Sequence, residues 1–328
     1  MKAIQQIGYG PTEQAVRLVD VDEPAPPGPH QTVIAVEAAP IQPTDLLMIE
    51  GTYGHLPPLP HILGVEGVGR VIATGRDVRH VTDGDRVLIP PFTSTWTEQV
   101  LTDATWLRPL PDGDVDQLSI LGMNSLTAQV MLTEFADLHP GDWVLQNAAN
   151  SSVGRAVIPI AHARQLRTVN VVRRPESVDE LTAAGADVVL LDGPDLPRRV
   201  AEATDDADIA LAFDGVGGIA TDTLRQTITR YGTVVVYSGM SGAPFTVSGP
   251  QLLFSGQSIR GFWIYNWLHD RPTHDDLAEV FAELIPLMTS GALTTPVAGT
   301  FTLDDYAAAL TVAARFDGKA ILRPTSTT

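Results

Sequence analysis

Cysteine is absent from this chain of 328 residues, and lysine occurs only at Lys2 and Lys319. Without cysteine the chain can form no disulfide, no thiolate zinc site and no iron–sulfur cluster, and it has no cysteine nucleophile. Positive charge is also scarce, with 21 Lys and Arg against 39 Asp and Glu and a formal net charge of −18. Because nucleic acids and anionic membranes are bound through Lys and Arg, we expect neither as a partner.

Long hydrophobic runs are missing as well. No stretch approaches the roughly 20 apolar residues of a membrane-spanning helix. Residues 1–10 are typical of a strand rather than of a signal or transit peptide, so we expect a cytoplasmic protein. The composition, 44% hydrophobic and 18% charged, is that of a globular chain. Its length favours two domains at roughly 150 residues each.

Short strands give way to alternating strands and helices part-way along the chain. Before about residue 115, β-rich runs are separated by Pro, Gly and Asp clusters, and only Asp45–Glu50 favours a helix. Later, Val- and Leu-rich strands alternate with helices, which predicts a parallel sheet covered on both faces. Strand-like runs return near 297–301 and 320–322. We predict an α/β chain in which a β domain (1–118 and 264–328) is interrupted by a doubly wound Rossmann domain (119–263).

One turn between a strand and a helix has the context of a dinucleotide-binding loop. The predicted strand Asp142–Gln146 runs into Asn147-Ala-Ala-Asn-Ser-Ser-Val-Gly154, and a helix follows. Ala149 and Ser151 or Ser152 stand where glycines are usual, but small residues still let the backbone approach a pyrophosphate at the helix N-terminus. An ordinary tight turn has the same pattern, so the loop alone leaves both interpretations open.

The end of the next strand favours one cofactor over another. A site for NAD has Asp or Glu about 20 residues after the loop, to bind the ribose 2′-hydroxyl. This chain has Asn170-Val-Val-Arg-Arg174 there, with Arg173 19 positions after Gly154 (173 − 154 = 19). Two guanidinium groups suit a 2′-phosphate, although they could also form a solvated face. The position predicts NADPH.

Three groups of segments carry a family resemblance. They are Ile41-Gln-Pro-Thr-Asp with Gly51-Thr-Tyr-Gly54 and Gly64-Val-Glu-Gly67; Asn124-Ser-Leu-Thr-Ala128 with the Asn147–Gly154 loop; and Val236-Tyr-Ser-Gly-Met240 with Arg260-Gly-Phe-Trp-Ile264. In this order and spacing they resemble the medium-chain dehydrogenase/reductase superfamily, and most of all its zinc-free, mitochondrial-type 2-enoyl thioester reductases. The resemblance extends from Met1 to about Leu322. It implies a GroES-like β domain and a homodimer joined through edge strands near 258–263 and 234–238.

The zinc ligands of related alcohol dehydrogenases have no equivalent in this chain. By resemblance, their positions match Gln42, Val65 and Asn124. An amide is a weak zinc ligand and valine is none. The eight histidines are scattered, without a His-x-x-x-His pair. We therefore expect no metal.

The resemblance also implies the reaction. In these enzymes NADPH gives a hydride to Cβ of a 2-enoyl thioester, charge moves to the thioester oxygen, and Cα takes a proton. By resemblance the proton donor is Tyr53, a phenol that is protonated at neutral pH. A loop tyrosine that only packs its ring is the alternative.

Further site residues follow from the resemblance alone. Gln42 replaces the family's usual Asn, and Val65 stands where the family often has Asn, so the acyl group that the enzyme accepts stays open. The implied substrate pocket is Gln42, Val65 and Trp263. The implied cofactor contacts are Asn124, Asn150, Ser151, Ser152, Val153, Gly154, Arg173, Arg174, Tyr237, Ser238, Gly239, Met240, Phe262, Trp263, Ile264 and Lys319.

Two other functions remain open at this stage. One is a zinc-free quinone or enone reductase that acts on a free small molecule, including one in a specialised biosynthetic pathway. The other is a non-enzymatic cofactor-binding protein of the same fold. The expected partner is a small molecule or an acyl thioester of CoA or an acyl carrier protein. Because those carriers are anionic, their binding requires cations at the entrance, for which Arg260 and Arg271 are the candidates.

Overall fold

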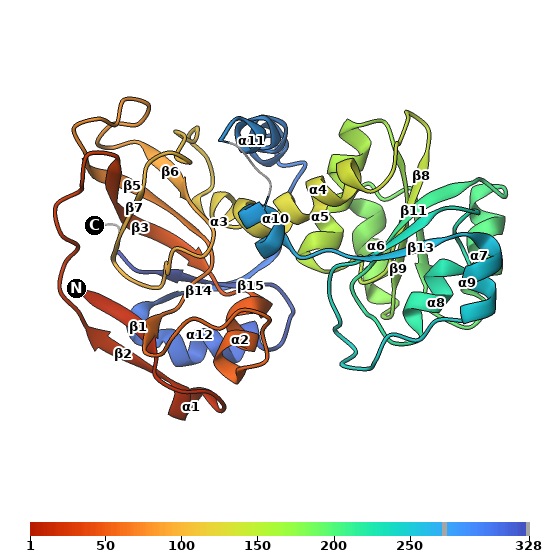
Figure 1. Cartoon of the computed structure of the whole chain (residues 1–328), viewed down its shortest axis with the longest axis horizontal. Coiled ribbons are helices and arrows are strands. Elements are labelled where there is room, and N and C mark those ends of the chain that lie inside the picture. The colour runs from red at the N-terminus through yellow and green to blue at the C-terminus, as the bar shows by residue number, and fades with distance from the viewer. Residues whose placement is uncertain (271–273, 326–328) are drawn as a thin grey trace. The chain divides into compact units, whose positions relative to one another are not determined.

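The computed structural model describes residues 1–270 and 274–325, which form two compact units (Figure 1). Unit 1 holds Met1–Met123, His274–Thr289 and Thr294–Thr328, and unit 2 holds Asn124–Thr273 and Ser290–Leu293. The chain thus returns to unit 1 after residue 273, whereas the sequence suggested a boundary after residue 263. Helix α10 (Ile264–Asp270) belongs to unit 2, where the Trp267 indole N–H donates to Glu134 Oε1 at 2.6 Å.

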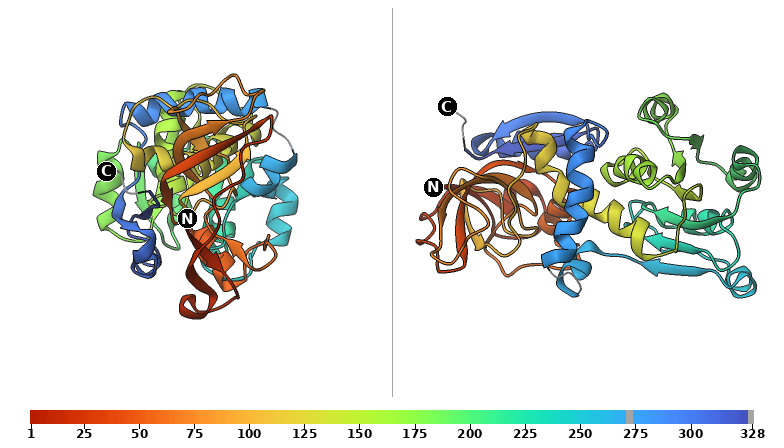
Figure 2. Two further views of the ribbon diagram at one scale, coloured as in Figure 1. Left: turned by 90° about the vertical axis from the view of Figure 1, so that its left-hand side faces the viewer. Right: turned by 90° about the horizontal axis from the view of Figure 1, so that it is seen from above.

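Unit 1 is built on two β-sheets. In one, β14-β15-β3-β5-β6 are neighbours and β7 pairs with β3; in the other the order is β2-β1-β4. The C-terminal strand β15 pairs antiparallel with β3, as the predicted return of the chain requires (Figures 1 and 2). The strands are β1 (Lys2–Gln6), β2 (Val16–Asp20), β3 (Gln31–Pro40), β4 (His61–Ile62), β5 (Gly67–Thr74), β6 (Arg86–Ile89), β7 (Gln99–Asp103), β14 (Val297–Thr302) and β15 (Lys319–Arg323).

The helices of unit 1 supply part of its core. Ala309, Leu310 and Ala313 of α12 pack into the same apolar cluster as Ile34 and the fully buried Trp96. The helices are α1 (Thr12–Ala15), α2 (Pro43–Glu50), α3 (Val115–Ser119), α11 (His274–Thr289) and α12 (Tyr306–Ala313), with a 3₁₀ turn at Leu303–Asp305. A π-helix, Leu121–Ser125, carries the chain into unit 2.

Unit 2 is a parallel sheet with strand order β10-β9-β8-β11-β12-β13 (Figure 1). This order reverses between β8 and β11, which is the topological switch point of a Rossmann fold. The strands are β8 (Trp143–Gln146), β9 (Arg167–Val172), β10 (Val188–Leu191), β11 (Ile209–Asp214), β12 (Thr233–Val236) and β13 (Ser258–Gly261). The helices besides α10 are α4 (Leu126–Glu134), α5 (Ser152–Ala163), α6 (Glu176–Ala183), α7 (Leu196–Thr204), α8 (Ala220–Arg225) and α9 (Gly249–Ser255). The predicted fold class is confirmed.

Two helices that lack a polar face were not predicted from the sequence. All residues of α4 from Leu126 to Leu132 are buried, so the helix shows no polar face and no 3.6-residue period. The α12 segment is partly exposed, but because its exposed side also carries Ala307 and Ala308 it shows no clear polar face either. Among the described helices, none is both long and apolar enough to cross a bilayer.

Candidate active site

The loop between β8 and α5, which the sequence predicts as a pyrophosphate cradle, packs closely against the N-terminus of the helix. Ser151 caps α5, since its Oγ accepts from the Gly154 N–H at 3.1 Å. A Cβ on Gly154 would lie 2.6 Å from Cα and O of Ala149, so only glycine lets the helix approach the strand this closely. The unpaired N–H groups of the first turn of α5 therefore lie at the carboxyl end of the sheet, where an anion can bind.

A buried aspartate, which sequence reasoning missed, ties together the loops on either side of the switch point. Asp214, at the end of β11, accepts through Oδ1 from Asn147 Nδ2 at 2.7 Å and from the N–H groups of Val216 and Gly217 at 2.9 and 3.0 Å. Asn147 Oδ1 in turn accepts from the Gly215 N–H at 2.7 Å. The signal in the sequence was a pair of polar residues at the carboxyl ends of two strands, since Asn147 directly follows β8 and Asp214 is the last residue of β11.

The two arginines after β9 differ in their surroundings. Arg174 lies 3.8 Å from Glu176 Oε1. Arg173 is exposed, and no carboxylate among the described residues pairs with it. In a chain with nearly twice as many acidic as basic residues, an unpaired guanidinium at the end of the second strand is a free position for an anion.

The predicted nicotinamide-end residues follow β12 and pack on the loop after β11. The Met240 N–H donates to Gly215 O at 3.2 Å, and a Cβ on Gly215 would meet the Tyr237 hydroxyl at 2.6 Å. Burial raises the pKa of Tyr237 to about 12, so the phenol stays protonated. No described group meets its hydroxyl with normal hydrogen-bond geometry, although the Ser151 side chain faces it. The structure thus brings Tyr237 and Ser151 together.

Aromatic side chains gather after β13. The Phe262 ring packs edge-on against Phe135, with centroids 5.5 Å apart, and Trp263 stacks on Tyr265 at 4.8 Å. The Arg260 guanidinium lies 4.9 Å from the Phe135 ring centre. Ile264 is buried at the start of α10. Arg271, the other cation considered for the carrier, lies outside the described residues.

In unit 1, Tyr53 stands directly behind the C-terminal cap of α2. Gly51 ends the helix with φ +81°, and the N–H groups of Thr52 and Tyr53 donate to Leu47 O at 2.9 and 3.3 Å. A Cβ on Gly51 would lie 3.0 Å from the Tyr9 ring, which fixes the path of the loop. Tyr53 is half-buried. Its backbone is thus placed by α2.

A buried polar cluster lies at the other end of α2. Its members are Gln42 and Lys319, which were predicted as site residues, and Asp45 and Glu66, which were not. Lys319 Nζ donates to Gln42 Oε1, and Gln42 Nε2 donates to Glu66 Oε1. Burial raises the pKa of Asp45 to about 7 and that of Glu66 to about 8, and it lowers the pKa of Lys319 to about 8. Val65, predicted for the substrate pocket, is buried beside Glu66.

Asn124 lies in the π-helix, a helical irregularity that is frequent at functional sites. Its side-chain Nδ2 is buried, and no described residue accepts a hydrogen bond from it. As for metals, no three His, Asp or Glu side chains in the described part of the chain come together as a binding site.

Comparison with known proteins identifies the family. Residues 28–141 match the alcohol dehydrogenase GroES-like domain, and residues 152–287 match the zinc-binding dehydrogenase domain. The mitochondrial enoyl-[acyl-carrier-protein] reductase of Bos taurus is 38% identical over 309 residues, which cover 92% of this chain and 82% of the relative. The chain belongs to this enoyl reductase family. The predicted resemblance is thereby confirmed, and with it the prediction of an oxidoreductase of the enoyl reductase type.

Solved structures show the fold of this enoyl reductase family member in two kinds of enzyme. The quinone oxidoreductase of Pseudomonas syringae pv. tomato DC3000 is 28% identical, with a TM-score of 0.84 and coverage of 98% of this chain and 99% of that one. The complex of Etr1p with NADP and crotonyl-CoA has a TM-score of 0.87 at the same coverage, and at 22% identity it shows the fold alone.

The expected cytoplasmic location is wrong on this comparison. The enoyl reductases of Bos taurus, Homo sapiens and Arabidopsis thaliana that match this family member are all mitochondrial enzymes. The expectation rests on the absence of apolar or targeting-type runs, and an absence does not identify a compartment.

Proposed function

We propose that the protein reduces the C2=C3 double bond of a 2-enoyl thioester with NADPH. The observation that carries this proposal is the match to enoyl-[acyl-carrier-protein] reductases along 92% of the chain. The reaction adds a hydride to Cβ, moves the electron pair to the thioester oxygen, and adds a proton to Cα. Initial rates of NADPH consumption with crotonyl-CoA, a quinone and a free enone test it. A crotonyl-CoA rate below both others would overturn it.

The residues of unit 2 fit a phosphorylated dinucleotide. The close approach at Gly154 and the capped N-terminus of α5 suit a pyrophosphate. Arg173 is an unpaired cation where a 2′-phosphate is expected. The Tyr237 hydroxyl and Asn124 Nδ2 are buried groups with unused hydrogen-bonding capacity. When bound, the reduced nicotinamide supplies the hydride.

Tyr53 is the proposed proton donor to Cα. Its backbone N–H is held on Leu47 O, so the side chain leaves the cap of α2 from a fixed point. A phenol that donates its proton has to recover it from solvent, and the exposed neighbours Thr52 and Gly54 leave the loop open to water. No role for zinc enters this chemistry, because Gln42, which stands at a zinc-ligand position of related enzymes, hydrogen-bonds Lys319 and Glu66 instead.

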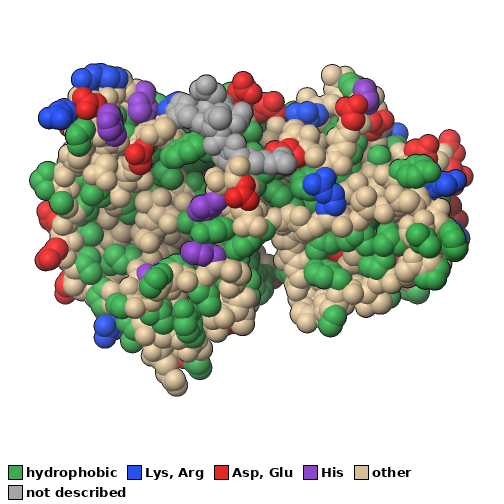
Figure 3. Space-filling view, viewed as in Figure 1, with side chains coloured by type: hydrophobic (Ala, Val, Ile, Leu, Met, Phe, Trp, Pro, Cys, Tyr) green, Lys and Arg blue, Asp and Glu red, His purple; other side chains and the backbone are tan. Residues whose placement is uncertain are grey.

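A quinone or enone reductase acting on a free small molecule is the second candidate. Two observations favour it: the 28% identity to a quinone oxidoreductase, and the arrangement of cations on unit 2. On the face of unit 2 drawn in Figure 3, the basic side chains, all of them Arg, stand apart rather than forming one basic patch for an anionic carrier. Arg260 lies over an aromatic ring instead. The same comparison of substrates decides between the two.

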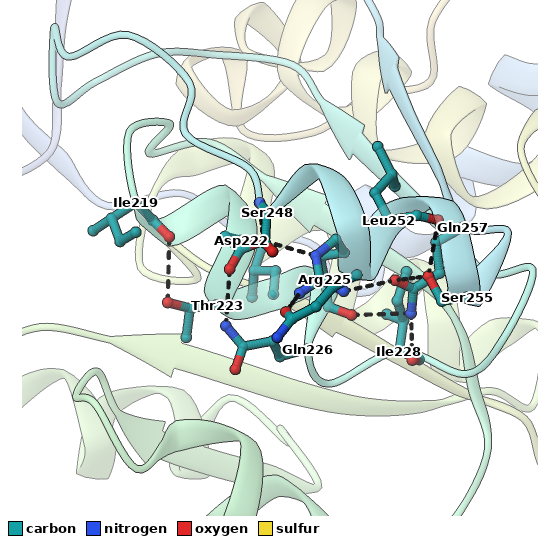
Figure 4. A network of polar contacts seen from close by, with 12 residues as sticks. Ile219, Asp222, Thr223, Arg225, Gln226, Ile228, Ser248, Leu252, Ser255 and Gln257 are labelled. Carbon is teal, nitrogen blue, oxygen red and sulfur yellow. Dashed lines mark hydrogen bonds and ion pairs between the residues drawn. The ribbon is translucent and has the colours of Figure 1, made fainter.

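We also propose that the protein forms a homodimer through the β13 edge of the unit 2 sheet. Leu253 and Phe254 of α9 and the nearby Tyr231 are about three-quarters exposed, which is unusual for large apolar side chains. Buried Arg225 donates to Gln251 Oε1 of α9 at 2.5 Å. It also donates to Gln257 Oε1, just beyond the helix, at 3.0 Å (Figure 4). A firmly held apolar helix beside an edge strand suits a second copy of the chain.

A further inference from the structure

The proposed reaction leaves the buried cluster of unit 1 unused. Asp45 and Glu66 are fully buried, and Gln42 and Lys319 are only 2% and 7% exposed. Burying an ammonium and two carboxyl groups is costly unless each is paired and hydrogen-bonded. The cluster also takes one of only two lysines in the chain. A group of this kind in a small β domain calls for a role.

The side-chain contacts of the cluster form one continuous network, which joins three segments of the polypeptide. The Ile41 N–H donates to Ala320 O at 2.9 Å, which sets Gln42 at the N-terminus of α2 beside Lys319 at the start of β15. The Gln42 carboxamide bridges the Lys319 ammonium and Glu66 Oε1. The second oxygen of Glu66, Oε2, accepts from the Met123 N–H in the π-helix at 2.8 Å.

Two further contacts show how tightly this contact network is held. Asp45 Oδ2 accepts from the Gln42 backbone N–H at 2.8 Å, so the bridging residue is fixed at its backbone as well as at its side chain. A Cβ on Gly122 would lie 3.2 Å from Glu66 Oε2, which leaves little space around the carboxylate. The charged groups that face Lys319 are Glu66 and Asp45. One protonated carboxyl therefore makes the cluster neutral.

Each end of this contact network leads to a residue that the proposed reaction needs. The π-helix residue bound by Glu66 is Met123, and Asn124 follows it directly. Helix α2 begins at the bridging Gln42 and ends at the cap that places Tyr53. Val65 precedes Glu66. The cluster thus holds the backbone segments on which three candidate site residues stand.

The bridge explains why the chain has glutamine where the family's usual residue is asparagine. One carboxamide must reach the ammonium with its oxygen and the carboxylate with its nitrogen. Asparagine is shorter by one carbon–carbon bond, about 1.5 Å. That difference is large against the narrow distance range of a hydrogen bond. From the backbone position of Gln42, asparagine cannot make both contacts.

We propose that Lys319, Gln42 and Glu66 are positioning residues that hold α2 and the π-helix in register, and that Lys319 does not contact the cofactor. The positioning proposal rests on the proposed function only in that its kinetic test uses the proposed reaction. The assignment differs from the role that the family resemblance implies for Lys319. If Lys319 is a positioning residue, breaking this contact network lowers turnover without weakening the binding of NADPH.

The variants Lys319→Met, Gln42→Asn and Glu66→Gln test the proposal. Misplacement of a reacting group by about 1 Å can cost 10²-fold in rate, so we expect kcat to fall ~10- to 100-fold in each. The dissociation constant of NADPH, measured by fluorescence titration, should stay within about twofold. Because contacting residues act as a unit, Gln42→Asn combined with Lys319→Met should be no worse than the worse single variant.

Matched controls are available in the same chain. Lys2→Met removes the other lysine, an exposed partner of Asp304 at 2.6 Å, and Gln14→Asn shortens an exposed glutamine. Neither should change kcat. A Lys319→Met variant that binds NADPH at least ~10-fold more weakly, while Gln42→Asn binds it normally, would overturn the proposal and restore Lys319 as a cofactor contact.

Hydrogen–deuterium exchange of the peptide spanning residues 121–125 gives a readout that needs no substrate. In Glu66→Gln and Gln42→Asn this peptide should exchange faster than in the parent protein, with exchange elsewhere unchanged. Unchanged exchange in both variants contradicts the positioning role. If the parent protein fails to reduce crotonyl-CoA, the proposed function falls, while exchange and NADPH binding still decide the role of the cluster. Gln42→Asn, the mildest change, covers the case in which another variant does not fold.

Discussion

At the scale of single residues, the role proposed for Tyr53 most sharply separates the candidate functions. Its backbone is fixed by the α2 cap, and its phenol is the proposed source of the proton for Cα. Tyr53→Phe keeps the ring and removes only the hydroxyl. General acids contribute about 10²- to 10⁴-fold, so we expect kcat for crotonyl-CoA to fall by about that factor, with little change in NADPH affinity. Steady-state kinetics measure both. An unchanged kcat would remove Tyr53 as the donor.

The raised pKa values of Asp45 and Glu66 predict how stability depends on pH. Folding raises the pKa of Asp45 to about 7 and that of Glu66 to about 8, because burial disfavours the charged form of each carboxyl group. The folded state thus holds protons that the unfolded state has lost between about pH 4 and pH 8. The two protonated carboxyl groups therefore contribute fully to stability below about pH 4. As the pH rises from about 4 to 8 this contribution is lost, and the free energy of unfolding falls by at most about 1.4 kcal/mol per pH unit for each group.

Glu66→Gln isolates half of this effect. The variant cannot titrate at position 66, so its free energy of unfolding should fall less between pH 5 and pH 8 than that of the parent protein. Urea denaturation at several pH values measures the two slopes. The lowered pKa of Lys319 acts in the opposite direction, but only above about pH 8. Parallel pH curves for parent and variant would contradict the raised pKa of Glu66.

At the scale of elements, the β-rich runs that Pro, Gly and Asp clusters separate were found from the sequence, and they form short strands such as β1, β5 and β6. Helix α4 is buried on nearly all sides and helix α12 is mostly apolar on its exposed side as well, so neither shows a 3.6-residue pattern of polar residues. Of the site, the β8–α5 loop was predictable from its strand–turn–helix context. The Asn147–Asp214 and Gln42–Glu66 bonds join residues 67 and 24 positions apart, which local patterns do not encode.

The packing of α5 against β8 gives a prediction at this scale. Gly154→Ala places a methyl group 2.6 Å from the backbone of Ala149, and inserting such a group typically costs about 1–3 kcal/mol. Helix α5 must move outward, which also widens the pyrophosphate cradle. We expect a lower melting temperature together with weaker NADPH binding, measured by thermal unfolding with and without NADPH. Gly84→Ala, at a position with φ +91° and no atom within 4 Å, is a control for backbone strain alone. Normal NADPH binding by Gly154→Ala would contradict the cradle.

At the scale of the whole molecule, the exposed apolar residues of α9 predict self-association. Phe254→Asp places a charge in the proposed interface without touching the Arg225 network that holds α9. Light scattering should give a dimer mass for the parent protein and a monomer mass for the variant, with the unit 2 fold intact by circular dichroism. A parent protein that is monomeric at micromolar concentration would rule out the β13 dimer.

The central claim is that the molecule reduces an enoyl thioester, and one labelling measurement tests it directly. Crotonyl-CoA is incubated with the protein and NADPH deuterated at the transferable position, in ordinary water, and the product is analysed by mass spectrometry and NMR. The expected product is butyryl-CoA with one deuterium at C3 and a solvent-derived hydrogen at C2. Unreacted crotonyl-CoA, under conditions in which a quinone or a free enone consumes NADPH, would contradict it and leave the free small molecule as the substrate.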